Sequence, residues 1–145
     1  MNLSQASSYN ELLVNILIEE LYRHNIDTFF ISPGSRSTPL TSSVAYNAKL
    51  TNHIHVDERS AAFAALGYAR ATGKSGVLIC TSGSAGANYF PAVCEASADS
   101  VPMMIITADR PPELHGALAN QTCNQQYLFG QQVRCFMNIE PPNKN

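Results

Sequence analysis

Apolar and polar positions along the chain recur with two different periods, which predict helices that alternate with short strands. Leu13, Leu17 and Leu21 lie at helical spacing among charged residues, so residues 9–24 are expected to form an amphipathic helix. Short apolar or β-branched runs are typical of strands. Four such runs predict strands at residues 27–31, 52–56, 76–80 and 101–107.

Three further helices are expected between these strands. The first has Pro39 in its first turn, where a proline ring is well tolerated, and the second is closed by Gly73. The third follows a loop of small residues. These helices are predicted to begin near residues 37–39, to run over residues 58–71, and to extend from the loop at residues 81–86 to about residue 98.

The chain beyond residue 107 has a weaker pattern and is expected to be mostly loop. A short helix is predicted near residues 125–129 and a last strand near residues 133–136. Residues 140–145 contain two prolines and two asparagines, which is typical of a linker. We therefore expect a domain over residues 1–139, followed by the start of a linker in an N-terminal fragment of a longer protein.

The alternation of helices and strands predicts an α/β fold with a mainly parallel, doubly wound sheet and helices on both faces. The run at residues 76–80 is apolar throughout, as expected for a strand that is covered on both sides. A length of 145 residues is sufficient for one domain with its own core.

Composition excludes several classes of function. A net charge of −2 gives no basic excess for binding nucleic acid, and the longest apolar runs are too short to span a bilayer. Residues 1–5 lack the regions of a signal peptide, so a cytoplasmic protein is expected. Only 14% of the residues are charged, whereas 45% are hydrophobic, which favours a surface partly covered by other parts of a larger protein or by a partner subunit in a homo-oligomer.

The cysteines indicate a reducing compartment. Cys80, Cys94, Cys123 and Cys135 show no C-x-x-C spacing. Cys80 and Cys94 lie in apolar or alanine-rich segments, and both are expected to be buried free thiols.

Four loops each follow an apolar strand, so they are expected to lie together at one edge of the sheet. That edge, outside the carboxyl ends of parallel strands, is the usual ligand site of an open α/β sheet. The four loops are residues 32–37, 57–58, 81–88 and 108–112.

Glu58 stands where a β-branched run stops and an alanine-rich helix begins. A carboxylate in this place can be held in a crevice and directed at a ligand. The pattern also permits a purely structural interpretation, in which the helix dipole favours Glu58 in the first turn and Asp57 is the N-cap.

Two arginines are candidates for binding anions. Arg36 lies in the Pro-Gly-Ser-Arg-Ser loop, and Arg110 follows the strand that ends near residue 107. A guanidinium group in such a loop can bind a carboxylate through two parallel hydrogen bonds. An ordinary turn around Arg36, and a pairing of Arg110 with Asp109, would explain the same residues structurally.

The loop at residues 81–86, Thr-Ser-Gly-Ser-Ala-Gly, offers backbone N–H groups and a helix N-terminus, which could cradle a phosphate. It matches neither G-x-G-x-x-G nor the P-loop pattern, so a dinucleotide or a P-loop site is disfavoured.

A metal site is a further alternative. His53, His55 and Asp57 fall on one face of their strand, and His-x-His-x-Asp is used by some metallo-hydrolases. Such sites need more histidines downstream, where only His115 is available. The metal interpretation is therefore disfavoured.

Together these motifs resemble the N-terminal, pyrimidine-binding domain of the thiamine-diphosphate-dependent enzymes. The resemblance covers nearly the whole chain and implies that fold. It rests on a Pro-Gly turn, a glutamate that opens an alanine-rich helix, a Gly-Tyr-Ala-Arg-x-Thr-Gly helix end and a Thr-Ser-Gly loop with a later asparagine. The matching positions are Pro33, Gly34, Glu58, residues 67–73, residues 81–83 and Asn88.

Residues 32–41, 107–114 and 119–121 are similar to the branch of this family that serves menaquinone biosynthesis. That likeness implies a transferase that decarboxylates 2-oxoglutarate and adds the remaining four-carbon unit to isochorismate. Another thiamine-diphosphate-dependent decarboxylase or carboligase, such as one of the acetolactate-synthase type, remains an alternative. So does a non-catalytic binding domain of the same fold.

The resemblance also implies roles for individual residues. Glu58 would hydrogen-bond a ring nitrogen of the cofactor's aminopyrimidine, with Pro33, Thr81 and Ser84 nearby. The positions implied for substrate binding are Ser35, Arg36, Arg110, Asn120 and Gln121.

The family binds Mg²⁺, or Mn²⁺ in its place, with the diphosphate through a Gly-Asp-Gly motif in a separate C-terminal domain. This chain contains no Gly-Asp-Gly. The family's active site forms between subunits, so the chain alone is expected to be inactive.

Overall fold

The computed structural model describes residues 8–114, 116–117 and 119–142. Its four strands are all parallel and form one sheet in the order β2-β1-β3-β4. The expected α/β class is therefore confirmed. The strands are β1 (Thr28–Ile31), β2 (Thr51–Ile54), β3 (Gly76–Cys80) and β4 (Met103–Thr107).

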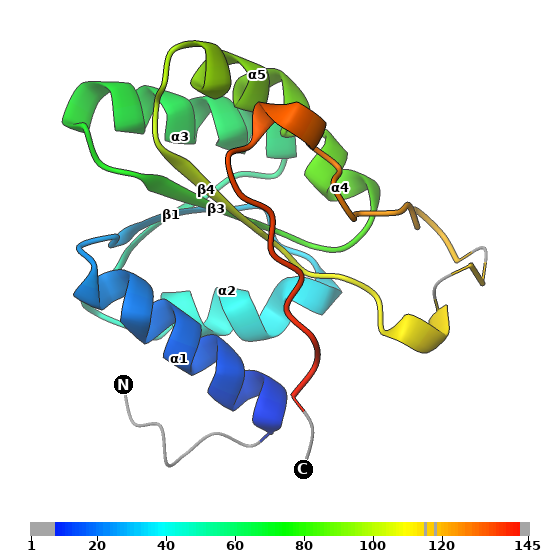
Figure 1. Cartoon of the computed structure of the whole chain (residues 1–145). Coiled ribbons are helices and arrows are strands. Elements are labelled where there is room, and N and C mark those ends of the chain that lie inside the picture. Colours follow the sequence, from blue (N-terminus) through cyan, green and yellow to red (C-terminus); the bar gives the residue numbers. More distant parts are fainter. Residues whose placement is uncertain (1–7, 115, 118, 143–145) are drawn as a thin grey trace.

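Helices cover both faces of the sheet (Figure 1). One face packs against α1 (Tyr9–Arg23) and α2 (Thr38–Ala45), and the other against α3 (Glu58–Thr72) and α5 (Phe90–Ala98). The helix expected to end at residue 98 is in two pieces, because the single turn α4 (Ser84–Ala87) precedes α5. The helix that was expected to begin near residues 37–39 is α2, which begins at Thr38 directly after a 3₁₀ turn, η2 (Ser35–Ser37).

Alternation along the central strands creates two apolar cores. Phe30, Leu78 and Cys80 lie in the core under α3 and α5. Phe29 and Ile79 lie in the core under α1 and α2. All of β3 is buried, which confirms that this strand is covered on both faces.

Helix α3 is shaped to lie close to the sheet. Its buried side is mostly alanine, and a Cβ on Gly76 would lie 3.3 Å from Ala65 Cβ. The Asp57 carboxylate caps the helix by accepting hydrogen bonds from Ser60 N at 2.8 Å and Ser60 Oγ at 2.9 Å. Gly73 ends the helix in the left-handed conformation at φ 71°. Both the N-cap and the glycine stop are as the sequence predicts.

The order of the strands reverses between β1 and β3. The chain leaves β1 through α2 to reach β2 at one edge, and then crosses through α3 on the opposite face to β3 and β4. Such a reversal opens a crevice at the carboxyl ends of the two strands, where α/β proteins bind ligands. Three of the four candidate loops flank this crevice or β2 beside it.

Two expectations for the C-terminal region are wrong. Residues 126–129 form turns rather than a helix, because Tyr127 has a left-handed φ of 55°, and η4 (Gly130–Gln132) follows. No strand is assigned at residues 133–136, because a strand needs a ladder partner and the described part of this segment is mostly exposed. It runs instead from the side of α5 towards the side of α1 (Figure 1).

The remaining boundaries differ by a few residues. Strand β2 ends at Ile54 rather than residue 56, and β4 begins at Met103 rather than residue 101. Cys80 is buried as expected, whereas Cys94 is half-buried, and both are free thiols. No helix within the described ranges has the length and apolar character needed to cross a membrane. The domain boundary after residue 139 stays a prediction.

Candidate active site

The loops after β1 and β3 touch each other at the crevice. A Cβ built on Gly34 would lie 2.5 Å from Thr81 Cβ, so only glycine lets the two loops approach so closely. The β1 end is held by Ser32 N, which donates to Ile79 O at 2.8 Å. The structure therefore brings the predicted residues Pro33 and Thr81 to one place.

Glu58 lies at the same edge of the sheet, as the first residue of α3, and is half-buried. The segment before it is fixed because His55 N donates to Ile31 O at 3.0 Å. Burial raises the pKa of the Cys80 thiol to about 12, a neighbouring Tyr89 hydroxyl opposes this rise, and the charge of Glu58 adds to it. The Glu58 carboxylate is thus close enough to influence the buried Cys80 thiol at the end of β3 electrostatically.

The loop at residues 81–84 is held against Gln121 by hydrogen bonds and close packing. Gly83 has φ 82°, and a Cβ there would lie 2.0 Å from the Gln121 carbonyl oxygen. That carbonyl accepts from Ser84 N at 3.0 Å, while Gln121 Nε2 donates to Ser82 O at 3.1 Å. Gln121 itself has a left-handed φ of 53°. A strained non-glycine residue held by its surroundings is a frequent feature of binding sites.

Gln125 is a central residue that the sequence analysis missed. Its buried amide accepts from Gly83 N at 2.6 Å and donates to Thr107 Oγ1 and Ala108 O, both at 3.0 Å. It thereby ties the loop after β3 to the end of β4. Its position in a run of polar residues gives no periodic signal of burial, so nothing in the sequence identified it.

These contacts argue against the phosphate cradle at residues 81–86. Two N–H groups that such a cradle would use are already engaged, Gly83 N by Gln125 and Ser84 N by Gln121. The helix that follows, α4, is only one turn long. Ser84 is exposed beside this turn.

The two arginines differ in their surroundings. The Arg110 guanidinium is half-buried and donates to Asn120 O at 2.5 Å, while its backbone N–H donates to Asp109 Oδ1 at 2.6 Å. Two predicted substrate residues, Arg110 and Asn120, are thus in contact. Arg36 and Ser35 are exposed in η2. Their roles in substrate binding stay predictions.

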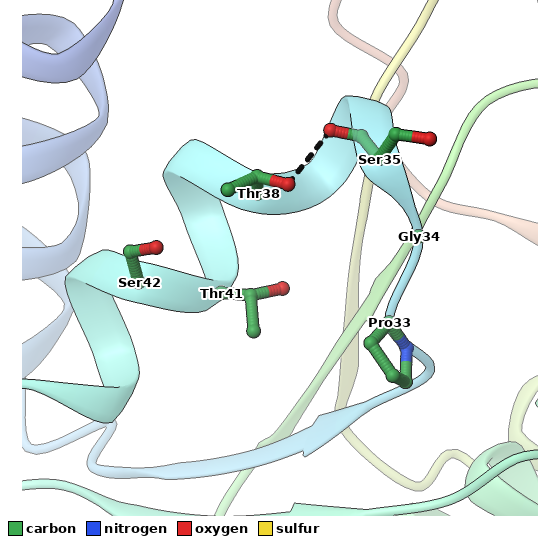
Figure 2. A pocket seen from close by; sticks show the side chains of 6 residues that line it. All are labelled: Pro33, Gly34, Ser35, Thr38, Thr41 and Ser42. Atoms are coloured by element: carbon green, nitrogen blue, oxygen red, sulfur yellow. Dashed lines mark hydrogen bonds between the residues drawn. The ribbon is translucent and has the colours of Figure 1, made fainter.

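A hollow of about 310 Å³ lies beside the Pro33–Ser35 loop (Figure 2). Hydroxyl groups line it, and Thr38 Oγ1 donates to Ser35 O at 2.8 Å. The Thr41 hydroxyl is also at this hollow, and its oxygen is buried without a hydrogen-bond partner among the described residues. Pro33 and Gly34 line the hollow as well as the crevice, whereas Glu58 is not among the residues that line the hollow.

The metal alternative gains no support. His53 and His55 share a face, as expected, because both rings lie near Phe30, with centroids at 5.0 and 6.1 Å. Among the residues that the structure describes, no group of three His, Cys, Asp or Glu could hold a metal ion. His115 lies outside the described residues.

An open parallel sheet with interlocked loops at its switch point defines a ligand-binding α/β domain. Comparison with known families identifies which one, because the model described as "Thiamine pyrophosphate enzyme, N-terminal TPP binding domain" matches residues 13–129. The chain therefore belongs to the thiamine pyrophosphate enzyme family.

Individual similar proteins point to one kind of enzyme within this family. The chain is 60% identical over 133 residues to a 2-succinyl-5-enolpyruvyl-6-hydroxy-3-cyclohexene-1-carboxylate synthase of Chlorobium phaeobacteroides (strain BS1), covering 92% of the chain and 23% of that protein. Synthases of the same name match from Chlorobium luteolum (strain DSM 273 / BCRC 81028 / 2530), 57% identical over 88% of the chain and 22% of the relative. The one from Syntrophus aciditrophicus (strain SB) is 47% identical over 95% and 24%. The chain thus spans about a quarter or less of these relatives.

Proposed function

We propose that this chain is the pyrimidine-binding part of a synthase that decarboxylates 2-oxoglutarate and adds the remaining four-carbon unit to isochorismate, in menaquinone biosynthesis. One observation carries the proposal: Glu58 opens α3 at the switch-point crevice, half-buried, in a chain of the thiamine pyrophosphate enzyme family. The names of the similar synthases support the choice of reaction.

The residues at the crevice fit the aminopyrimidine end of thiamine diphosphate. Such a ring needs a shielded carboxylate and closely packed backbone, and here Glu58 stands beside loops that touch at Gly34 and Thr81. When bound, the cofactor supplies the electron sink for the decarboxylation.

The chain's own residues would bind and orient that group. Glu58 would hold a proton between its carboxyl oxygen and a pyrimidine nitrogen, which would be most effective once the bound ring shields the pair from bulk water. Pro33, Thr81 and Ser84 would lie along the ring.

Both proposed substrates carry carboxylates, which suits the arginines. Arg36 and Arg110 would bind the carboxylates of isochorismate, since guanidinium groups match them with paired hydrogen bonds. Ser35, Asn120 and Gln121 would add polar contacts. Arg110 is already oriented by Asn120 O, and Gln121 by Ser82 O.

The diphosphate and its Mg²⁺ or Mn²⁺ would be held by another part of the protein. No residue of this chain is proposed to bind that metal. A homo-oligomer with the site between subunits, in the cytoplasm, completes the proposal.

The test uses the whole protein encoded by the reading frame that contains this chain. Carbon dioxide release from 2-oxoglutarate is measured with thiamine diphosphate and Mg²⁺, with and without isochorismate. We expect release coupled to isochorismate consumption. Glu58→Gln keeps the size of the side chain but removes its acidity, so turnover should fall at least about 100-fold while the protein stays folded.

Other outcomes would redirect the assignment. Release without dependence on isochorismate would indicate another decarboxylase or carboligase of the family. Cofactor binding without any decarboxylation, or no binding at all, would indicate a non-catalytic domain and overturn the proposal.

A further inference from the structure

Three polar side chains lie buried together behind the crevice. Ser32 follows β1 and is 2% exposed, Cys80 ends β3, and Tyr89, just before α5, is fully buried at 0%. Ser32 and Cys80 follow the alternation of Phe30 and Leu78, so both face α3 and α5. Tyr89 packs into the same core.

Two of these groups have no hydrogen-bond partner within the part of the chain that the structure describes. Ser32 Oγ and Tyr89 Oη are buried, and neither finds a partner with normal geometry among the described residues. Buried hydroxyls are almost always hydrogen-bonded in native proteins, because leaving one unpaired forfeits its bonds to water. Two adjacent orphans therefore indicate that an acceptor completes the cluster in the functional state.

Glu58 is the acceptor that the surroundings supply, because it is half-buried at the first residue of α3, the helix whose buried side packs into the same core. Its charge contributes to the raised pKa values of both Cys80 and Tyr89, after the dominant contribution of burial. The neighbouring carboxylate of Asp57 is committed to Ser60. A thiol is a weak acceptor, so Cys80 does not satisfy the hydroxyls.

We propose that Ser32 and Tyr89 are positioning residues for Glu58, joined in a hydrogen-bonded chain in which Ser32 donates to the Tyr89 oxygen and Tyr89 donates to the Glu58 carboxylate. The chain forms when Glu58, at the first residue of α3, turns toward the sheet. It would fix the carboxylate from behind while its other oxygen meets the pyrimidine. This last step rests on the proposed function, whereas the chain itself does not.

A double-mutant cycle tests the link without any cofactor. Tyr89→Phe, Glu58→Gln and the double variant are unfolded with denaturant, and the midpoints are compared. If Tyr89 donates to Glu58, Tyr89→Phe lowers the midpoint, and this loss is at least halved in the Glu58→Gln background. If Tyr89 is only a packing residue, its effect is the same in both backgrounds, which would overturn the proposal.

Tyr68→Phe is the matched control. Tyr68 packs against the same core, with its ring 5.8 Å from Phe30, but it has no part in the proposed chain. Its effect should add to that of Glu58→Gln. If Tyr89→Phe does not fold, Ser32→Ala replaces it in the same cycle, with the same expected non-additivity and the same contradicting outcome.

A second cycle measures thiamine diphosphate affinity in the whole protein by calorimetric titration. Tyr89→Phe should weaken binding about tenfold when Glu58 is present, and less than about twofold in Glu58→Gln. Equal losses in both backgrounds would contradict the positioning role. If no variant binds the cofactor while the unfolding cycle remains coupled, the proposed function fails and the hydrogen-bonded chain stands.

Discussion

The contact between Gly83 and Gln121 shows how single residues shape the crevice. Gly83 has a positive φ, and the Gln121 carbonyl occupies the space where a side chain would begin. The Thr-Ser-Gly motif could be read from the sequence, but the partner of its glycine could not, because the two residues are far apart in the chain. The same distance in sequence hides the role of Gln125, since its three partners lie in the loop after β3 and at the end of β4.

Gly83→Ala should be strongly destabilising. The new Cβ would lie 2.0 Å from Gln121 O, in a backbone conformation that L residues avoid. We expect the free energy of unfolding to fall by at least about 2 kcal/mol, measured by chemical denaturation. Gly67→Ala is the control, because a Cβ at this helical glycine would meet no atom of the described residues within 4 Å. It should raise stability by roughly 0.5–1 kcal/mol, and equal losses in both variants would refute the steric explanation.

Asp57 should contribute to acid sensitivity. The Asp57 carboxylate accepts two hydrogen bonds from Ser60, and both lower its pKa below the usual 3.8. The bond from the backbone N–H contributes most, and the bond from the side-chain hydroxyl contributes next. A carboxyl with a lowered folded pKa stabilises the protein above its unfolded pKa, and this is lost as pH falls through the folded value. Asp57→Asn should keep the helix cap at neutral pH but remove this contribution to the loss of stability in acid. Asp57→Ala removes the cap itself, so it should also lower the melting temperature at neutral pH. Melting curves at about pH 7 and about pH 3 would show it, and identical acid profiles for wild type and Asp57→Asn would contradict it.

At the scale of elements, local patterns predicted most of what the structure shows. Helix α1, strand β3 and helix α3 begin and end within a residue or two of their expected bounds, because each has a clear period, a cap or a glycine stop. The region after β4 was predicted less well. There, conformation depends on tertiary contacts such as the ring pair Tyr127 and Phe136, 4.7 Å apart, rather than on periodicity.

Gln125→Leu tests how strongly one side chain joins two of these elements. The change removes three hydrogen bonds and leaves Gly83 N without its acceptor, so stability should fall by about 3 kcal/mol. Amide exchange at Gly83 should accelerate as the loop is released. Gln126→Leu alters the exposed neighbour and should change stability by less than about 0.5 kcal/mol. Unchanged exchange at Gly83 in Gln125→Leu would show that the loop is held by other contacts.

At the scale of the whole molecule, the edge of the sheet is incompletely covered. Strand β2 is exposed throughout. Its last residue, Ile54, is 56% exposed, and Val56 just beyond it is 96% exposed. The low charge content pointed to a covered surface, but composition alone could not place it. The alternation of helices and strands, by contrast, was sufficient to predict parallel strands. Parallel strands in turn predict that the candidate loops lie at one edge of the sheet.

Val56→Asp should weaken self-association. An exposed apolar side chain at an open edge strand favours pairing with another copy, and a carboxylate there opposes it. Sedimentation of the whole protein over a range of concentrations should show a shift toward the monomer in this variant. Met137→Asp, at a side chain that is 74% exposed in the C-terminal segment, should leave the association unchanged. A wild-type protein that is monomeric at every concentration would refute the expectation.

Because Cys80 is deeply buried, the rate at which its thiol reacts should report how often the helices α3 and α5 separate from the sheet. Alkylating reagents attack the thiolate, and burial keeps Cys80 protonated, with a pKa of about 12. Cys135 is exposed and should react at once, while Cys80 should react only when α3 and α5 separate from β3. The delay between the two labelling reactions would therefore measure how often α3 and α5 separate from the sheet, and a tightly bound ligand should lengthen this delay.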